Sequence, residues 1–384
     1  MRAVAALAAL ALWTGSAMAQ QASDAPTSKK GKTDDLRQQV EQLKQRVDEL
    51  SRQEEPAKPA ASATHLGGYG ELHYTHLDSG NTIDLHRVVL FVGHDFTEHA
   101  RFVSEIEFEH ALIENDSGAA EGGAVEVEQA YVEFDVGERS RARAGLLLVP
   151  VGILNETHEP PAFYGVERNP VESEIIPTTW RETGAAVGTA FGDSGVSLDV
   201  AVHSGLSTDG TDFEPHEGLQ EGAEATANKF AGTGRLKFTG PHGLQIAATA
   251  QYQQDVTQGV PGVERTPALL LEGHAMADAG PVNLRALYAA WHFDSDAARA
   301  LFQDRQQGYY GEASWRVVQS FGFFGRYSVL DNGGATAGTE VRQVNAGFNY
   351  WPIDNVVLKA DWQDRDGNAG RDDDGFALGV GWQF

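Results

Sequence analysis

The chain contains no cysteine, only three methionines, and few basic residues for its length of 384. Without cysteine there can be no disulfide scaffold, cysteine-based zinc site or thiol nucleophile. A mean hydropathy of −0.34 is too low for a bundle of membrane helices, each of which needs an apolar run of about 20 residues. With 29 Lys+Arg against 55 Asp+Glu the net charge is −26, so nucleic acid is not expected as a partner. The length allows one to three domains.

Residues 1–19 have the pattern of an export signal. Arg2 precedes a compact apolar run that ends near Trp13, and Ala17-Met18-Ala19 forms a small-residue cleavage site. The run is too short to be a comfortable membrane anchor. We therefore expect 1–19 to be a cleaved signal peptide and the mature chain to lie beyond the inner membrane.

The next segment is expected to hold one short helix. Residues 20–32 are polar and are predicted to be disordered, and 33–55 begin with Thr33, a good helix cap. The apolar residues then alternate in spacings of four and three, which is typical of a coiled coil: Leu36, Val40, Leu43, Val47 and Leu50. An amphipathic helix on a barrel or lipid surface is the alternative. Residues 56–64 read as a Pro/Ala linker.

From residue 65 to 384 the pattern changes to period two, which predicts strands. Sixteen segments of roughly ten residues follow one another: 66–77, 83–95, 100–112, 124–136, 141–149, 180–191, 195–204, 229–238, 243–254, 267–277, 281–293, 307–317, 319–330, 340–350, 354–363 and 375–384. Short and long connections alternate, no segment looks helical, and 205–228 and 294–306 are ambiguous. An even number of strands with tight turns at one end is typical of a transmembrane antiparallel β-barrel.

The alternation within strands gives the expected orientation of their faces. In 243–254, Ile246 and Tyr252 share one face while Gln251 and Gln253 share the other. Because a barrel of this size encloses water, we expect apolar faces to contact lipid and polar faces to line the lumen. Aromatic residues near strand ends would form two interfacial girdles: Phe134, Phe191, Phe238, Phe321, Trp382 and Phe384 near the short turns, and Trp180, Tyr252 and Trp362 near the long loops.

The last strand and several motifs resemble known bacterial proteins. The strand ends in Trp382 and Phe384, which is similar to the signal that the barrel-assembly machinery reads. The segments GGYGE at 67–71, RVVLFVGH at 87–94, PVGILNETHEPP at 150–161 and IIPTTW at 175–180 resemble the phosphate-selective porin O/P superfamily over residues 65–384. The resemblance implies a homotrimer of water-filled barrels in the outer membrane of a Gram-negative bacterium, in contact with lipid and lipopolysaccharide, with the helix in the periplasm.

The longest connection, about 150–179, is expected to fold into the lumen as general porin loops do. Its charged residues include Glu156, Glu159 and Arg168. Opposite these, the wall would present an acidic row and a set of basic residues, and the resulting transverse field would orient hydrated solutes or ions; the alternative is that the charges pair locally. The candidate wall residues are Glu105, Glu107, Glu109, Arg141, Arg143, Arg235, Lys237, Arg285, Arg316 and Arg326, with Arg101.

These residues favour a channel for passive diffusion of small hydrophilic solutes. Phosphate selectivity would need a dense ladder of Arg and Lys, and the barrel has three lysines; the acidic surplus favours mild cation preference. No cofactor and no metal is expected, because His73 and His76 point to opposite faces of a strand and His158 has no second ligand nearby in sequence. No enzyme is expected either, since G-x-S-x-G is absent. The remaining alternative is an envelope anchor that acts through the coiled coil.

Overall fold

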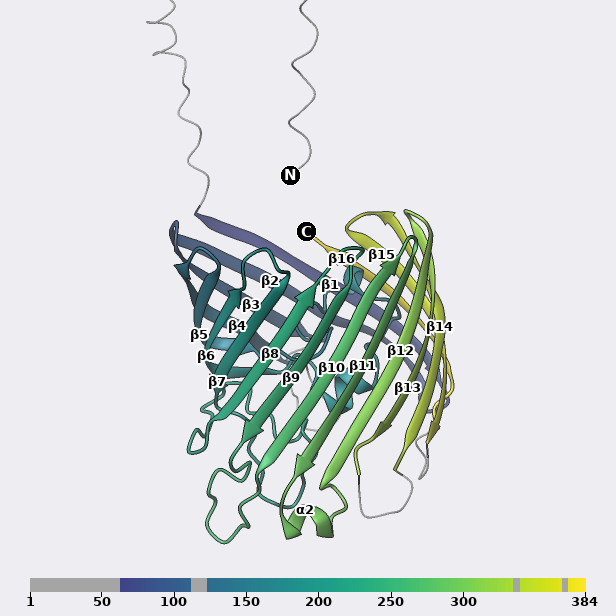
Figure 1. The fold of residues 1–384 in the computed structure, drawn as a ribbon. Helices are drawn as coiled ribbons and strands as arrows, with labels where there is room; N and C mark the ends of the chain where they lie inside the picture. The colour runs from purple at the N-terminus through teal and green to yellow at the C-terminus, as the bar shows by residue number, and fades with distance from the viewer. Residues whose placement is uncertain (1–62, 112–122, 334–338, 368–371) are drawn as a thin grey trace, which may run out of the picture. The chain divides into compact units, whose positions relative to one another are not determined.

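The computed structural model describes residues 63–111, 123–333, 339–367 and 372–384. Within them, sixteen antiparallel strands close into a barrel in which each strand pairs with its sequence neighbours and β1 pairs with β16 (Figure 1). This confirms the predicted antiparallel β-barrel and the predicted number of strands. The predicted signal peptide, the segment 20–32, the predicted coiled-coil helix and residues 56–62 of the predicted linker lie outside the described residues.

Every segment predicted as a strand contains one, with ends that shift by a few residues. The strands are β1 (Thr64–Leu77), β2 (Gly80–Thr97), β3 (Ala100–Glu109), β4 (Val125–Gly137), β5 (Ser140–Leu148), β6 (Arg181–Ala190), β7 (Val196–His203), β8 (Ala231–Thr239), β9 (Gln245–Gln253), β10 (Ala268–Ala279), β11 (Val282–Phe293), β12 (Arg305–Val318), β13 (Phe321–Asp331), β14 (Val341–Ile353), β15 (Val356–Gly367) and β16 (Gly375–Gln383).

The barrel closes between its first and last strands. Tyr69 on β1 lies opposite Gln383 on β16, and the main chains of Gly68 and Phe384 exchange two hydrogen bonds of 3.0 and 2.8 Å. The last residue of the chain is thus part of the closing ladder. With every strand paired on both sides, the sheet has no free edge.

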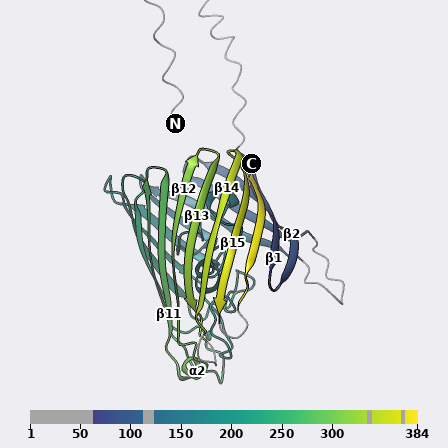
Figure 2. The same cartoon turned by 90° about the vertical axis from the view of Figure 1, so that its right-hand side faces the viewer.

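The connections differ between the two ends of the barrel. Short turns lie at one end, and the long loops lie at the other (Figures 1 and 2). One long loop contains the short helix α2 (Asp296–Ala300), whose cap is the Ser295 hydroxyl accepting from the Ala298 amide at 3.1 Å. This helix lies within residues 294–306, which the sequence left ambiguous, and the Ser–Asp start stabilises its one turn. No described helix has the length and apolarity to cross a membrane.

The outer surface of the barrel is apolar, as the alternation predicts. On β9, Ile246 and Tyr252 are half-exposed on the outside, whereas Gln251 and Gln253 are buried on the inside. The same arrangement recurs on β7 and β15. Large apolar side chains therefore form the outward face of many strands: Val200, Leu236, Leu271, Leu284, Tyr309, Phe323, Trp362, Phe376 and Leu378.

The interior departs from the simple expectation of a polar, water-filled lumen. A cluster of buried apolar side chains lies inside the barrel, where Trp291 and Phe293 on β11 stack at 5.4 Å between ring centroids. Trp180 joins this cluster and is fully buried. Its predicted place in an interfacial girdle was wrong, because the residue precedes β6 and turns inward onto Trp291, 5.8 Å between ring centroids.

Candidate functional site

A long segment, residues 149–180, runs inside the barrel between β5 and β6. It contains two short helical turns, η1 (Pro160–Ala162) and η2 (Val171–Ile175). The first turn contacts β1, β15 and β16, and the second contacts β11, β12 and β13. Because these strands lie far around the ring from β5 and β6, the segment crosses the lumen. We call it the inserted segment.

The two ends of the inserted segment are tied together by one side chain. The amide nitrogen of Asn155 donates to the carbonyls of Val149 and Trp180, at 2.8 and 3.1 Å, while its oxygen accepts from the Trp180 amide at 2.7 Å. Asn155 is 4% exposed. The two ends of the segment, where it leaves β5 and where it reaches β6, are therefore held next to each other.

A buried carboxylate organises the middle of the inserted segment. Glu172 accepts hydrogen bonds from the amides of Ile153 and Leu154 at 2.6 and 2.8 Å, and from the side chain of Asn169 at 3.1 Å. Tyr310 on β12 donates a further bond of 2.8 Å. Four donors compensate for the cost of burying the charge. The sequence placed Glu172 among the acids of this loop but did not predict its organising role, because its partner Tyr310 is distant in sequence.

Side chains of the facing wall hold the backbone of the inserted segment. These bonds satisfy carbonyls that a buried loop would otherwise leave without partners. Each bond runs from a wall side chain to a backbone carbonyl of the segment: Arg285 donates to Ala162 at 3.3 Å, Arg326 to Tyr164 at 2.7 Å, Asn349 to Phe163 at 3.0 Å and Trp291 to Ile175 at 2.9 Å. Arg285 and Arg326 were predicted as lumen residues, whereas Asn349 and Trp291 were missed.

Glycines on the wall make room for the inserted segment. A Cβ atom at Gly381 on β16 would lie 2.4 Å from the Cβ of Pro160, and one at Gly308 on β12 would lie 3.0 Å from Val171. Both positions face inward. The backbone of the segment can therefore approach the wall more closely than any other residue type would allow.

Acidic residues of the inserted segment meet basic residues of the wall at three places. Glu156 pairs with Arg235 on β8, whose guanidinium also lies 3.0 Å from Asp199. The other two pairs are Glu174 with Arg365 at 2.8 Å and Glu167 with His73 at 2.7 Å. Of these residues, Glu156 and Arg235 were predicted as site residues, and the structure brings them together.

The basic residues of β3 and β5 pair locally with acidic residues of β4. Arg101 lies 3.1 Å from Glu133 and 2.5 Å from Asp135. Arg143 lies 2.7 Å from Glu133, and Arg141 lies 3.6 Å from Asp135. The alternative of local pairing describes this part of the wall, because the strand register places these residues opposite one another.

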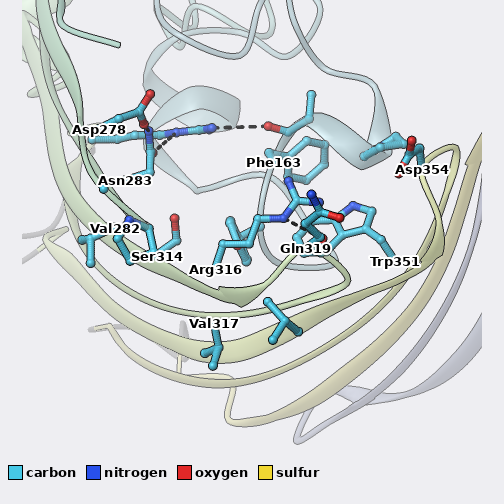
Figure 3. A pocket seen from close by; sticks show the side chains of 17 residues that line it. Phe163, Asp278, Val282, Asn283, Ser314, Arg316, Val317, Gln319, Trp351 and Asp354 are labelled. Atoms are coloured by element: carbon cyan, nitrogen blue, oxygen red, sulfur yellow. Dashed lines mark hydrogen bonds between the residues drawn. The ribbon is translucent and has the colours of Figure 1, made fainter. Parts of the chain in front are cut away.

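A cavity of 830 Å³ lies between the inserted segment and the short-turn ends of β10 to β15 (Figure 3). Arg285 and Arg316 line it, together with Phe163 of the inserted segment. The Arg316 guanidinium stacks on Trp351, 4.3 Å from the ring centroid. On the adjoining wall, Arg326 pairs with Glu312 at 2.9 Å.

The remaining predicted residues occupy several surroundings. Glu105 and Glu107 are buried on β3 and Glu109 is half-buried at its end. Lys237 is half-buried on β8, two residues from Arg235 on the same face, and Glu159 caps η1 without a side-chain hydrogen bond to it. Arg168 has one buried nitrogen, Nη2, without a hydrogen-bond partner.

His158 of the inserted segment lies between two buried wall carboxylates. Its Nε2 atom is 3.5 Å from Glu105 Oε1 and 3.6 Å from Glu128 Oε2, although the sequence offered no partner for this histidine. Burial lowers the pKa of His158, but the two carboxylates outweigh that effect and bring the pKa above its ordinary value.

Solved structures with the same fold are outer-membrane channels. An anion-selective porin from Comamonas acidovorans is 14% identical, with a TM-score of 0.61 over 84% of this chain and 99% of that chain. The outer-membrane channel DcaP of Acinetobacter baumannii is 14% identical, with a TM-score of 0.58 over 85% and 99%. Salmonella typhi OmpF, in complex with daunomycin, is 14% identical, with a TM-score of 0.58 over 84% and 97%. At these identities the likeness establishes a shared fold.

No family model matches the chain, so nothing here supports the phosphate-selective porin O/P superfamily in particular. A relative by sequence is found in Aquifex aeolicus (strain VF5), where a protein described as uncharacterized is 32% identical over 369 residues. The match covers 85% of this chain and 83% of that protein. This chain and the Aquifex aeolicus protein therefore belong to one family.

Proposed function

We propose that the protein is an outer-membrane porin, a water-filled channel for passive diffusion of small hydrophilic solutes and ions. The observation that carries the proposal is the closed barrel of sixteen strands, apolar outside and largely polar inside, with a segment crossing its interior. An apolar belt around a closed sheet satisfies the backbone within lipid. The likeness in fold to three outer-membrane channels supports the same function.

In this proposal the inserted segment forms the constriction. Glu156 and Arg235 are its central charge pair, and Arg285 and Arg316 line the lumen on the side of the short turns. The field proposed across the channel arises from Arg285 and Arg316 on one side of the interior, since the acidic residues of β4 on the other side are already paired with arginines. Such a field would orient dipolar solutes as they pass.

We propose a general porin with mild cation preference rather than a phosphate channel. Phosphate selectivity needs guanidinium and ammonium groups that are free to replace the hydration shell of the anion. Here Arg87 pairs with Glu71, Arg326 with Glu312, and Arg235 with two carboxylates. Most of the positive charge of the wall is thereby already neutralised.

The proposal includes the assembly of the channel. Three copies would form a homotrimer in contact with lipid and lipopolysaccharide, with the short turns and the N-terminal helix on the periplasmic side. The barrel-assembly machinery would insert the chain by its last strand, where Trp382 and Phe384 end the outward apolar row of β16.

Solute uptake by liposomes tests the function directly. Liposomes that contain the purified full-length protein should swell in isotonic solutions of small sugars, at rates that fall steeply with solute size. Liposomes prepared with heat-unfolded protein are the control. Swelling no faster than in that control, with the barrel shown to be folded by circular dichroism, would contradict the proposal.

A further inference from the structure

The strongest feature that the proposed function does not explain is a buried cluster of one imidazole and two carboxylates. Glu105, Glu128 and His158 are 2%, 0% and 3% exposed, and their ligating atoms all lie within 4.8 Å of one another. They come from β3, β4 and the inserted segment. The cluster therefore joins two wall strands to the segment that crosses the lumen.

The atoms that converge in this cluster accept no hydrogen bond of normal geometry in the described structure, although Glu107 also faces Glu128. They are His158 Nε2, Glu105 Oε1 and both carboxylate oxygens of Glu128. Buried polar atoms without partners are costly. The two separations from Nε2, 3.5 and 3.6 Å, are longer than a normal N–H···O bond of about 2.7–3.2 Å. They match the edge of a tetrahedron of ligands around zinc, about 3.3–3.6 Å for bonds of about 2.0–2.2 Å.

The surroundings prepare the histidine as a ligand. The carbonyl of Asn155 lies 3.2 Å from His158 Nδ1, and because a carbonyl can only accept, Nδ1 carries a proton. In the neutral ring Nε2 then keeps its lone pair and points at the carboxylates. A backbone carbonyl on the far nitrogen is the usual outer contact of a metal-bound histidine.

The carboxylates are oriented in the same way. Gln129 donates to Glu105 Oε2 at 2.5 Å and leaves Oε1 to face His158. Glu128 is the extra residue of a β-bulge, because Glu105 pairs with Gln129 and the next residue, Ile106, pairs with Val127. A bulge turns side chains away from the regular alternation, and here it directs both Glu128 and Gln129 into the interior.

We propose that Glu105, Glu128 and His158 bind one divalent transition-metal ion of the zinc class, which fastens the inserted segment to the barrel wall. The imidazole ligand and the small number of oxygens disfavour calcium and magnesium, which prefer six or more oxygen ligands. The ion has a structural role, and the site does not depend on whether the barrel conducts.

The test uses full-length protein without a polyhistidine tag, treated with EDTA and titrated with Zn²⁺ in detergent. We expect one zinc ion per chain and a higher unfolding temperature in zinc than in EDTA. His158→Asn keeps a donor for the Asn155 carbonyl but removes Nε2, and Glu128→Gln removes one charged ligand. Both variants should bind zinc at least tenfold more weakly.

His274→Asn is the matched control, because it removes another buried imidazole whose carboxylate partner, Glu272, lies 2.7 Å away. This variant should keep the zinc. If the wild-type protein binds no zinc, and unfolds at the same temperature in zinc and EDTA, the cluster is an imidazolium–carboxylate pair and the proposal is overturned. Zinc retained by His158→Asn overturns it as well. If the variants fail to fold, zinc binding and the unfolding temperatures of the wild-type protein in zinc and in EDTA decide the test. The test does not measure conductance, so its result is independent of the proposed function.

Discussion

The phenol of Tyr310, on β12, donates a 2.8 Å hydrogen bond to the carboxylate of Glu172, which lies 138 residues earlier in the chain. This bond joins the inserted segment to the wall it faces. Because Glu172 also holds the amides of Ile153 and Leu154, the fold of the segment and its attachment to the wall share one carboxylate. Stability of the segment and the shape of the lumen are therefore linked.

Replacing Tyr310 with Phe should loosen this attachment while keeping the aromatic ring. The loss of one buried hydrogen bond to a carboxylate should lower the free energy of unfolding by about 1.5–3 kcal/mol. Urea unfolding of the barrel in detergent, followed by tryptophan fluorescence, measures the change. Tyr309→Phe, on the outward face of the same strand, is the control, and an equal effect in both variants would contradict this role.

Enlarging Gly381 should push the inserted segment away from the wall. A Cβ at this position would already meet Pro160 at 2.4 Å, and the stiff proline ring cannot turn aside. Gly381→Val should therefore destabilise the barrel by about 1–3 kcal/mol and change its single-channel conductance. Gly325→Val, at an outward position with no atom within 4 Å of the added Cβ, should behave as wild type; unchanged conductance in the Gly381 variant would refute the close contact.

Removing the positive charge of Arg235 should make the channel more selective for cations. Glu156 and Asp199 would then face the lumen without their shared partner. A unit charge contributes about 1 kcal/mol at 4 Å in water, so Arg235→Gln should raise the cation-to-anion permeability ratio about two- to fivefold at low salt. Reversal potentials in a KCl gradient measure the ratio.

The control for Arg235→Gln is Arg342→Gln, which removes the same charge from an exposed side chain paired with Glu340. This control should leave the reversal potential unchanged. A shift of equal size in both variants would indicate a general charge effect and not a constriction.

Deleting residues 33–55 should weaken the proposed association of three copies without altering the channel of each one. A tethered coiled coil adds stability to an oligomer through its effective concentration. Size-exclusion chromatography with light scattering, over a range of detergent concentrations, should show more monomer in the deletion. Intact trimers together with lost attachment of the outer membrane to the cell wall would instead favour the anchoring role.

The strands could be predicted from the sequence because the alternation of apolar and polar residues shows which side chains face outward and which face the interior. The alternation of Ile246 and Tyr252 with Gln251 and Gln253 reappears as outward and inward faces. The local pairs of Arg101 and Arg143 with Glu133 follow from the same parity and register. Because this alternation extends along the whole strand, the predicted strand boundaries differ from the observed ones by only a few residues.

The interior of the barrel could not be predicted in the same way. Glu172 and Tyr310 meet across the lumen without any periodic signal, and Trp180 turns inward from a position at which aromatic residues commonly face lipid. The bulge at Glu128 coincides with a change of phase in the sequence, where the apolar positions shift from Val125 and Val127 to Val132 and Phe134, but this change does not indicate what the bulge faces. Because these features depend on the path of a single irregular segment, only the three-dimensional structure identifies His158 as the residue that joins two carboxylates.

Conductance of the purified full-length protein in a planar lipid bilayer tests the central proposal most directly. A water-filled barrel with an inserted segment should give discrete, ohmic current steps in KCl, in groups of three if the trimer inserts as a unit, with a reversal potential of mild cation preference. Protein that is folded and inserted in the bilayer but produces no current steps under any applied voltage would contradict the account.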